Sequence, residues 1–127
     1  MAVLLLSIKP QAAQQILQGT KHYEYRRCCP SRNVTTLLLY VTAPVQRVIA
    51  SVEVLSCLEG TPEQLWQQTV AGAGAAREQV LTYLQGCTRA CAFELGAVHC
   101  FALPQKLSVY GVGKAPRSFV YLSEDVL

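Results

Sequence analysis

Residues 19–26 read Gly-Thr-Lys-His-Tyr-Glu-Tyr-Arg, and this stretch marks the point where a first helix gives way to a strand. Upstream, Pro10 opens a segment whose apolar residues at positions 12, 13, 16 and 17 fall on one helical face. Proline is tolerated in a first helical turn, and Gly19 stands where helices commonly end in a left-handed residue. Downstream, residues 21–28 predict a strand, because aromatic residues recur among them.

The charged residues of this stretch predict a site. In a regular strand alternate side chains share a face, so Glu24 and Arg26 lie together. Lys21 can converge with Glu24 only if it lies in the turn after Gly19, where this alternation does not apply. We therefore expect Glu24 and Arg26 to form an orienting ion pair, and Lys21 to be the freer, reactive group.

The remainder of the chain predicts further strands and two more helices. Thr61 can cap a helix that Pro62 begins, and Gln64 can complete a capping box. Alternating or β-rich apolar runs predict the strands, with a hairpin around Gly96 and a short strand at residues 107–110. The predicted strands are 2–8, 21–28, 34–42, 45–58, 90–97, 98–103 and 118–122, and the predicted helices are 10–18, 62–70 and 75–85.

This order of elements favours an α+β, mainly β fold. Neighbouring strands follow one another in sequence and the helices are few and short, which is typical of a sheet curled into a barrel. A parallel doubly wound sheet would need a helix after nearly every strand. We expect residues 1–127 to form one domain, a small mixed or antiparallel β-barrel with two to three short helices at its ends.

Composition narrows the classes of function. Of the 127 residues, 51% are hydrophobic and only 15% charged, so the chain has enough apolar surface to fold and is not disordered. The net charge is +3, and the first 53 residues hold six Lys or Arg against two Glu. This asymmetry suits contact with phosphates, and it equally suits a solvated face that keeps the protein soluble.

The sequence predicts neither a membrane segment nor a metal. The apolar stretch at residues 1–6 is far shorter than the ~18 residues that a span needs, and it lacks the features of a secretion signal. We expect a cytoplasmic protein, or a nuclear one in a eukaryotic cell, whose cysteines stay thiols. Cys87, Cys91 and His99 are a conceivable metal set without the usual zinc spacing, so no metal and no cofactor is predicted.

Four blocks of sequence follow one another in order and resemble those of ASCH domains. The first contains Leu-Leu-Ser-Ile-Lys-Pro and then the pattern Gly-x-Lys-x-x-Glu-x-Arg. The four blocks are residues 5–26, 40–54, 61–66 and 116–122, so they span nearly the whole chain. The resemblance implies a PUA-like barrel with a cleft beside the first helix.

The resemblance also implies a range of activities. ASCH domains are associated with RNA binding, with coregulator roles and, in some members, with catalysis. In members that deacylate cytidines, a Thr stands three residues after the motif lysine. Here Glu24 takes that position, which argues against a nucleoside amidohydrolase of that kind. In ribonuclease-like members a Lys, a Tyr and a Ser are implicated, and this chain offers Lys21, Tyr23 or Tyr25, and Ser118.

Binding of RNA or another single-stranded nucleic acid in a basic cleft is the first function that we expect. The alternatives are a small metal-independent hydrolase acting on RNA or on a modified nucleoside, and a protein-interaction scaffold or coregulator. RNA cleavage without a metal needs a base, an acid and nearby cations. We therefore predict Lys21 and Glu24 as catalytic residues, and the resemblance to ribonuclease-like members adds Ser118 as a third. The predicted ligand contacts are Ser7, Lys9, Tyr23, Tyr25, Arg26, Thr42 and Arg117, with barrel packing as the other possible role of the two tyrosines.

Overall fold

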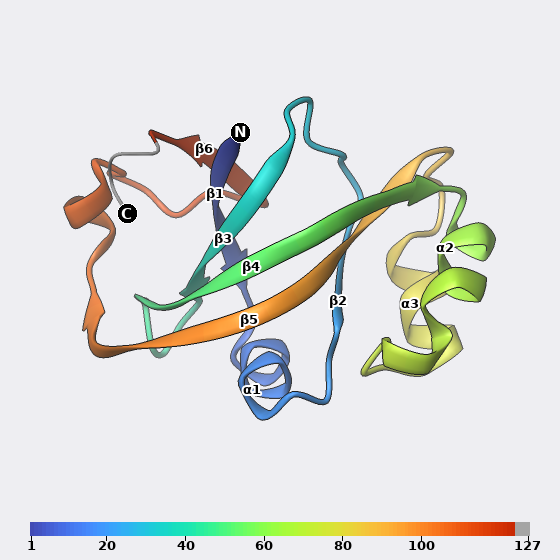
Figure 1. The fold of residues 1–127 in the computed structure, drawn as a ribbon, viewed down its shortest axis with the longest axis horizontal. Helices are drawn as coiled ribbons and strands as arrows, with labels where there is room; N and C mark the ends of the chain where they lie inside the picture. The colour runs from blue at the N-terminus through green and yellow to red at the C-terminus, as the bar shows by residue number, and fades with distance from the viewer. Residues whose placement is uncertain (124–127) are drawn as a thin grey trace.

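The computed structural model describes residues 1–123, so the last four positions of the predicted domain lie outside the described residues. Its helices and strands confirm most of the predicted elements (Figure 1). Two 3₁₀ turns, Val70–Gly72 and Leu107–Tyr110, accompany them. The elements are β1 (Ala2–Ile8), α1 (Pro10–Gln18), β2 (Tyr23–Arg26), β3 (Val34–Val41), β4 (Arg47–Gly60), α2 (Pro62–Thr69), α3 (Arg77–Tyr83), β5 (Ala90–Gln105) and β6 (Phe119–Leu122).

Within residues 1–123, the strands form a single six-stranded mixed sheet in the order β2-β5-β4-β3-β1-β6. Among the described strands, only β1 and β3 pair in parallel, since α1 and β2 provide the crossover that parallel neighbours need. The other four pairs are antiparallel. The sheet curls into a half-barrel whose two edge strands, β2 and β6, are the ends of the order. The predicted α+β, mainly β class is confirmed.

The sheet is buried on both faces around its centre. In β1, Leu4 and Leu6 join the core inside the half-barrel, whereas Val3 and Leu5 join a cluster on the outer face. This two-sided burial explains why the strand reads as a continuous apolar run and not as an alternation. The helix α1 covers the inner face with Ala13 and Ile16. The helices α2 and α3 pack together beyond the ends of β4 and β5 (Figure 1).

Two helix ends form as the sequence predicts. Gly19 ends α1 in the left-handed conformation, with φ +80°, and its N–H bonds back into the helix. Thr61 caps α2 in a reciprocal capping box with Gln64. The first of these ends turns the chain from α1 toward β2, and the second turns it from β4 over the outer face.

The predicted hairpin around Gly96 is wrong, because β5 runs without a break from Ala90 to Gln105. Gly96 instead permits a close approach. A Cβ at this position would lie against Glu53 Oε1 and 2.9 Å from Leu55 Cδ2, where the register of β4 and β5 shifts. A glycine inside a strand often marks such a bulge. The predicted strand at residues 107–110 is also wrong, since this stretch is the second 3₁₀ turn, which ends at a left-handed Gly111.

Among residues 1–123, no helix is long and apolar enough to cross a lipid bilayer.

Candidate functional site

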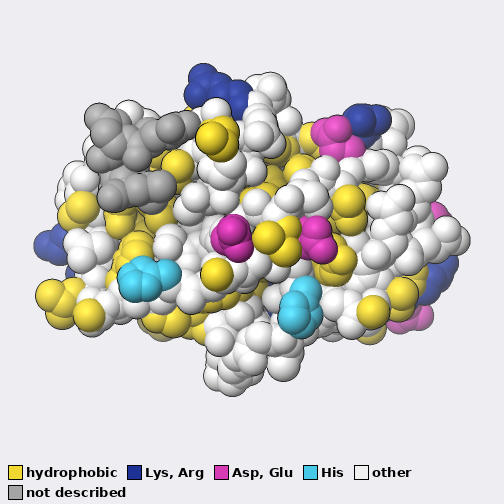
Figure 2. Space-filling model, viewed as in Figure 1, with side chains coloured by type: hydrophobic (Ala, Val, Ile, Leu, Met, Phe, Trp, Pro, Cys, Tyr) yellow, Lys and Arg dark blue, Asp and Glu magenta, His cyan; other side chains and the backbone are white. Residues whose placement is uncertain are grey.

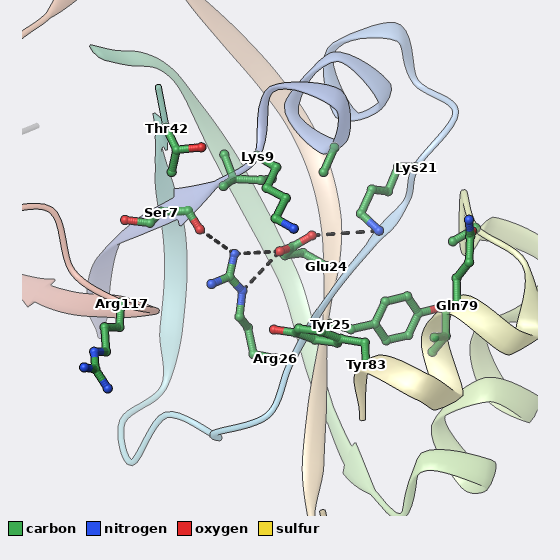
Figure 3. A pocket seen from close by; sticks show the side chains of 14 residues that line it. Ser7, Lys9, Lys21, Glu24, Tyr25, Arg26, Thr42, Gln79, Tyr83 and Arg117 are labelled. Carbon is green, nitrogen blue, oxygen red and sulfur yellow. Dashed lines mark hydrogen bonds and ion pairs between the residues drawn. The ribbon is translucent and has the colours of Figure 1, made fainter. Parts of the chain in front are cut away.

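A cavity of about 420 Å³ lies where β2 faces the ends of β1 and β6, with α3 across it (Figure 3). This volume falls within the roughly 300–1,000 Å³ that is typical of small-molecule sites. The lining side chains come from segments far apart in sequence. They are Ser7, Ile8, Lys9, Ala12, Lys21, Glu24, Tyr25, Arg26, Thr42, Ala75, Gln79, Val80, Tyr83 and Arg117.

Lys21 lies in the connection between α1 and β2, one residue before His22 and two before the strand begins. Its backbone N–H bonds to Gln15 O at 3.2 Å, and the N–H of His22 bonds to Gly72 O at 2.8 Å. These bonds direct the lysine into the cavity. Its Nζ lies 3.8 Å from Glu24 Oε1, donates to Ala73 O at 3.4 Å, and sits 5.1 Å above the ring of Tyr25. Lys21 therefore lies before the regular strand, as the sequence requires if Lys21 and Glu24 are to converge.

Glu24 and Arg26 form the predicted ion pair. Arg26 Nε and Nη2 both donate to Glu24 Oε2, at 3.1 and 2.7 Å. Nη2 also donates to Ser7 O at 2.7 Å, and Nη1 donates at 3.4 Å to the carbonyl and the hydroxyl of Ser118. Arg26 thus makes five hydrogen bonds, as many as its five N–H groups. It joins the edge strand β2 to β1 and to the start of β6, which are at the other end of the sheet.

The three charged side chains are buried together. Lys21, Glu24 and Arg26 are only 8%, 6% and 6% exposed, and two cations with one anion leave a net charge of +1. Burial lowers the pKa of Lys21 from its ordinary value, the charge of Arg26 lowers it further, and Glu24 offsets part of this effect. Among residues 1–123, hydrogen bonds reach Glu24 only at Oε2. Lys21 and Glu24 Oε1 are therefore the groups of this cluster that can serve a ligand.

Replacing Lys21 with methionine tests the lowered pKa of the lysine. Between that lowered pKa and 10.5, the unfolded chain binds the lysine proton more tightly than the folded protein does. The stability of the wild type relative to Lys21→Met should therefore rise as pH rises through this interval. Urea unfolding of both proteins from pH 7 to 10.5 measures the difference, in which all other titrating groups cancel. A difference that is constant or falls with pH would contradict the burial of a charged lysine.

The other predicted site residues divide into two groups. Ser7, Lys9, Thr42 and Arg117 line the cavity, and Lys9 and Arg117 are exposed cations at its mouth. Tyr25 lines it as well, but its hydroxyl bonds to Thr69 at 2.6 Å and burial raises its pKa. Tyr23 and Ser118 are not among the lining residues. Tyr23 packs beside Gly72 in the cluster under α2 and α3, and Ser118 serves as an acceptor for Arg26.

The contribution of α3 to the cavity, above all that of Gln79 and Tyr83, was not predicted from the sequence. The helix itself was predicted, and its periodicity places these two residues one turn apart, next to the inward Val80. That spacing was the feature of the sequence from which a shared position of Gln79 and Tyr83 on one helix face could have been predicted. What the sequence did not show is that α3 crosses the cavity, because the packing of α3 against β2 depends on contacts between distant segments.

Cys87, Cys91 and His99, all of which are described, are not brought together as a metal set. Within residues 1–123, no group of three or more His, Cys, Asp and Glu side chains is arranged to hold a metal ion. Cys91 and His99 lie on the same strand, eight residues apart, which corresponds to roughly 26 Å at the usual rise of a strand.

Comparisons with known proteins agree with this architecture. A family model described as the ASCH domain matches residues 6–100. Over 125 residues the chain is 29% identical to an ASCH domain-containing ribonuclease from Zymomonas mobilis subsp. mobilis, and the match covers 95% of this chain and 84% of that relative. The crystal structure of ASCH from Zymomonas mobilis is similar with a TM-score of 0.85 at 25% identity, covering 98% of this chain and 90% of that one.

A further match covers only a small part of the relative's own length. Over 120 residues the chain is 25% identical to a Ureaplasma parvum protein named ATP synthase subunit alpha, and the match covers 94% of this chain but 15% of that protein. The chain therefore spans a small part of this relative's length. The family model, in contrast, matches well over half of this chain, and the fold agrees with a solved member. The chain belongs to the ASCH domain family.

Proposed function

We propose that the cavity binds single-stranded nucleic acid, RNA in preference, with Lys21 contacting a backbone phosphate. The observation that carries this proposal is the buried net charge of +1 in a cavity whose mouth holds two exposed cations, Lys9 and Arg117. A phosphate would neutralise this charge in surroundings where water screens it poorly. Arg26 supplies charge but keeps its donors within the protein, so its role is to position Glu24.

The preference for RNA rests on Glu24. Its Oε1 is a carboxylate oxygen that faces the cavity 3.8 Å from Lys21 Nζ and receives no hydrogen bond from residues 1–123. A ribose 2′-hydroxyl is a donor that can fill this position, and DNA lacks that group. The relative named ASCH domain-containing ribonuclease supports RNA as the ligand class.

Basic residues elsewhere on the surface support nucleic-acid binding less strongly than the cations of the cavity do. Figure 2 shows the face that carries β4 and β5, where acidic side chains lie near the centre, histidines lie below them, and Lys and Arg side chains lie toward the rim. That face therefore offers no broad positive surface. The cations of the cavity are a more specific place for a phosphate than the +3 net charge of the whole chain.

Fluorescence anisotropy with labelled single-stranded RNA and with DNA of the same sequence tests the proposal. We expect RNA to bind more tightly than DNA, and the affinity to fall steeply with salt. Lys21→Met should weaken RNA binding at least tenfold and reduce the slope of log affinity against log salt by about 0.7, the contribution of one phosphate contact to a single strand. Glu24→Gln should reduce the preference for RNA over DNA.

Lys106→Met is the matched control, because Lys106 is an exposed lysine that does not line the cavity. It should bind RNA within about twofold of the wild type, since exposed charges far from a ligand are largely screened at physiological salt. Absence of RNA binding by the wild type at low salt would overturn the proposal. Equal binding by Lys21→Met and the wild type would overturn it as well.

A second candidate function is metal-independent hydrolysis of RNA or of a modified nucleoside. The contact between Lys21 and Glu24 favours it, because a lysine whose pKa is lowered by burial is a better general acid, and the adjacent carboxylate can act as a base toward a 2′-hydroxyl. We expect product formation that persists in EDTA and disappears in both Lys21→Met and Glu24→Gln. RNA and nucleosides that remain intact after long incubation with wild-type protein would remove this candidate and leave the binding function standing.

A further inference from the structure

Two aromatic side chains line the cavity among the described residues, and only one presents a broad free surface. Tyr25 is 5% exposed, its hydroxyl is bonded to Thr69, and Lys21 lies over its ring. Tyr83 is 45% exposed although it lines the same cavity. Figure 3 shows its side chain extending from α3 across the cavity toward Arg26. Tyr83 is therefore an aromatic group at the mouth whose ring is open to a ligand.

The backbone under Tyr83 is fixed even though its side chain is exposed. Arg27, which follows Arg26 at the end of β2, donates from Nη1 to Tyr83 O at 2.7 Å and to Gln85 O at 2.9 Å. On the inner side of α3, Val80 and Leu84 are almost fully buried. The last turn of α3 is thus tied to the strand that carries Glu24, so the ring and the buried charges keep a set relative position before any ligand arrives.

We propose that Tyr83 is a base-stacking platform and that the cavity takes one unpaired nucleotide at a time. This inference rests on the proposed binding of RNA, and it specifies which part of the RNA the cavity recognises. The phosphate and ribose lie toward Lys21 and Glu24, and the base lies on the ring of Tyr83. A volume of about 420 Å³ is of a size that suits a single nucleotide. Stacking on an aromatic ring tolerates any base, because each base has a π-face.

The experiment compares wild type, Tyr83→Ala, Tyr83→Leu and Tyr83→Phe in binding to single-stranded RNA that carries 2-aminopurine. We expect Tyr83→Ala to weaken binding roughly 10- to 100-fold, with the salt slope unchanged because no phosphate contact is lost. Tyr83→Phe keeps the ring and should bind within about threefold of the wild type. The fluorescence of 2-aminopurine should be quenched on binding to wild type and Tyr83→Phe, and not on binding to Tyr83→Leu. Duplex RNA of the same sequence should compete poorly.

The outcomes separate this inference from the function on which it rests. If wild-type protein binds no RNA, the proposed function fails. If wild type binds RNA but Tyr83→Ala binds equally well, the function stands and the stacking role is overturned. Equal affinity and equal quenching for Tyr83→Leu and Tyr83→Phe would overturn it too, since leucine replaces the apolar area of the ring without its π-system. Duplex RNA that competes as well as single-stranded RNA would overturn the single-nucleotide site.

Discussion

Replacing Arg26 with methionine is expected to lower the free energy of unfolding by about 3–5 kcal/mol. The substitution removes one partner of a buried ion pair and leaves Glu24, 6% exposed, without its hydrogen bonds. It also removes the donors to Ser7 O and Ser118 that join the two ends of the sheet. Urea denaturation followed by circular dichroism measures the loss.

Two further variants test whether the loss of stability comes from the burial of the ion pair and from the geometry of the guanidinium group. Arg77 pairs with Glu63 on the surface, where both side chains are more than half exposed. Arg77→Met is therefore the matched control and should cost about 0–1 kcal/mol. Arg26→Lys keeps the charge but lacks the planar fork, so its stability should lie between Arg26→Met and the wild type. If Arg26→Met loses no more stability than Arg77→Met does, the cluster does not hold the sheet ends together.

Replacing Gly74 with alanine is expected to cost about 2–5 kcal/mol and to weaken binding at the cavity. Gly74 has φ +68°, a conformation that costs other residues roughly 1–2 kcal/mol. Its added Cβ would lie 2.8 Å from Lys21 Cβ and 2.9 Å from Lys21 Cα, so the lysine backbone must move. Such overpacking adds about 1–3 kcal/mol. Urea unfolding and the RNA anisotropy measurement report the two effects.

Gly111 provides the control that separates the two contributions. It has a similar positive φ of +73°, but apart from its chain neighbours no atom of the described residues lies within 4 Å of the position that its Cβ would take. Gly111→Ala should therefore cost only about 1–2 kcal/mol, from the backbone conformation, and leave RNA binding unchanged. The difference between the two variants in free energy of unfolding measures the steric cost of crowding the segment after α2 against the turn that holds Lys21. Equal losses of stability and equal RNA affinities would show that this contact does not position the lysine.

The sequence predicted the local features of the site because local chemistry determines them. The left-handed Gly19 ends α1 whatever the rest of the chain does, and it places Lys21 before the strand where alternation does not hold. The spacing of Glu24 and Arg26 then puts both on one strand face, where opposite charges pair. In each case the interacting residues are close in sequence, so their geometry follows from backbone conformation alone.

Features that depend on distant contacts were not predictable in this way. Gly96 is typical of a turn when only its neighbours are considered, whereas its actual role is to admit the side chains of Glu53 and Leu55 from the adjacent strand. Tyr83 belongs to a predicted helix, yet its place at the cavity depends on Arg27 anchoring that helix to β2. Ser118 was predicted as catalytic by family resemblance, and its position beside Arg26 across the sheet appears only in the folded chain.

The gap between the two sheet edges is spanned by the side chain of Arg26, and the cavity occupies that gap. In a barrel closed by a backbone ladder, the circumference changes only when a strand is added or its register moves. Here the circumference beside the cavity depends on the reach of one guanidinium group. A substitution at this position can therefore change the width of the binding space without adding or removing a strand, so the size of the ligand that this scaffold accepts depends on one side chain as well as on strand pairing.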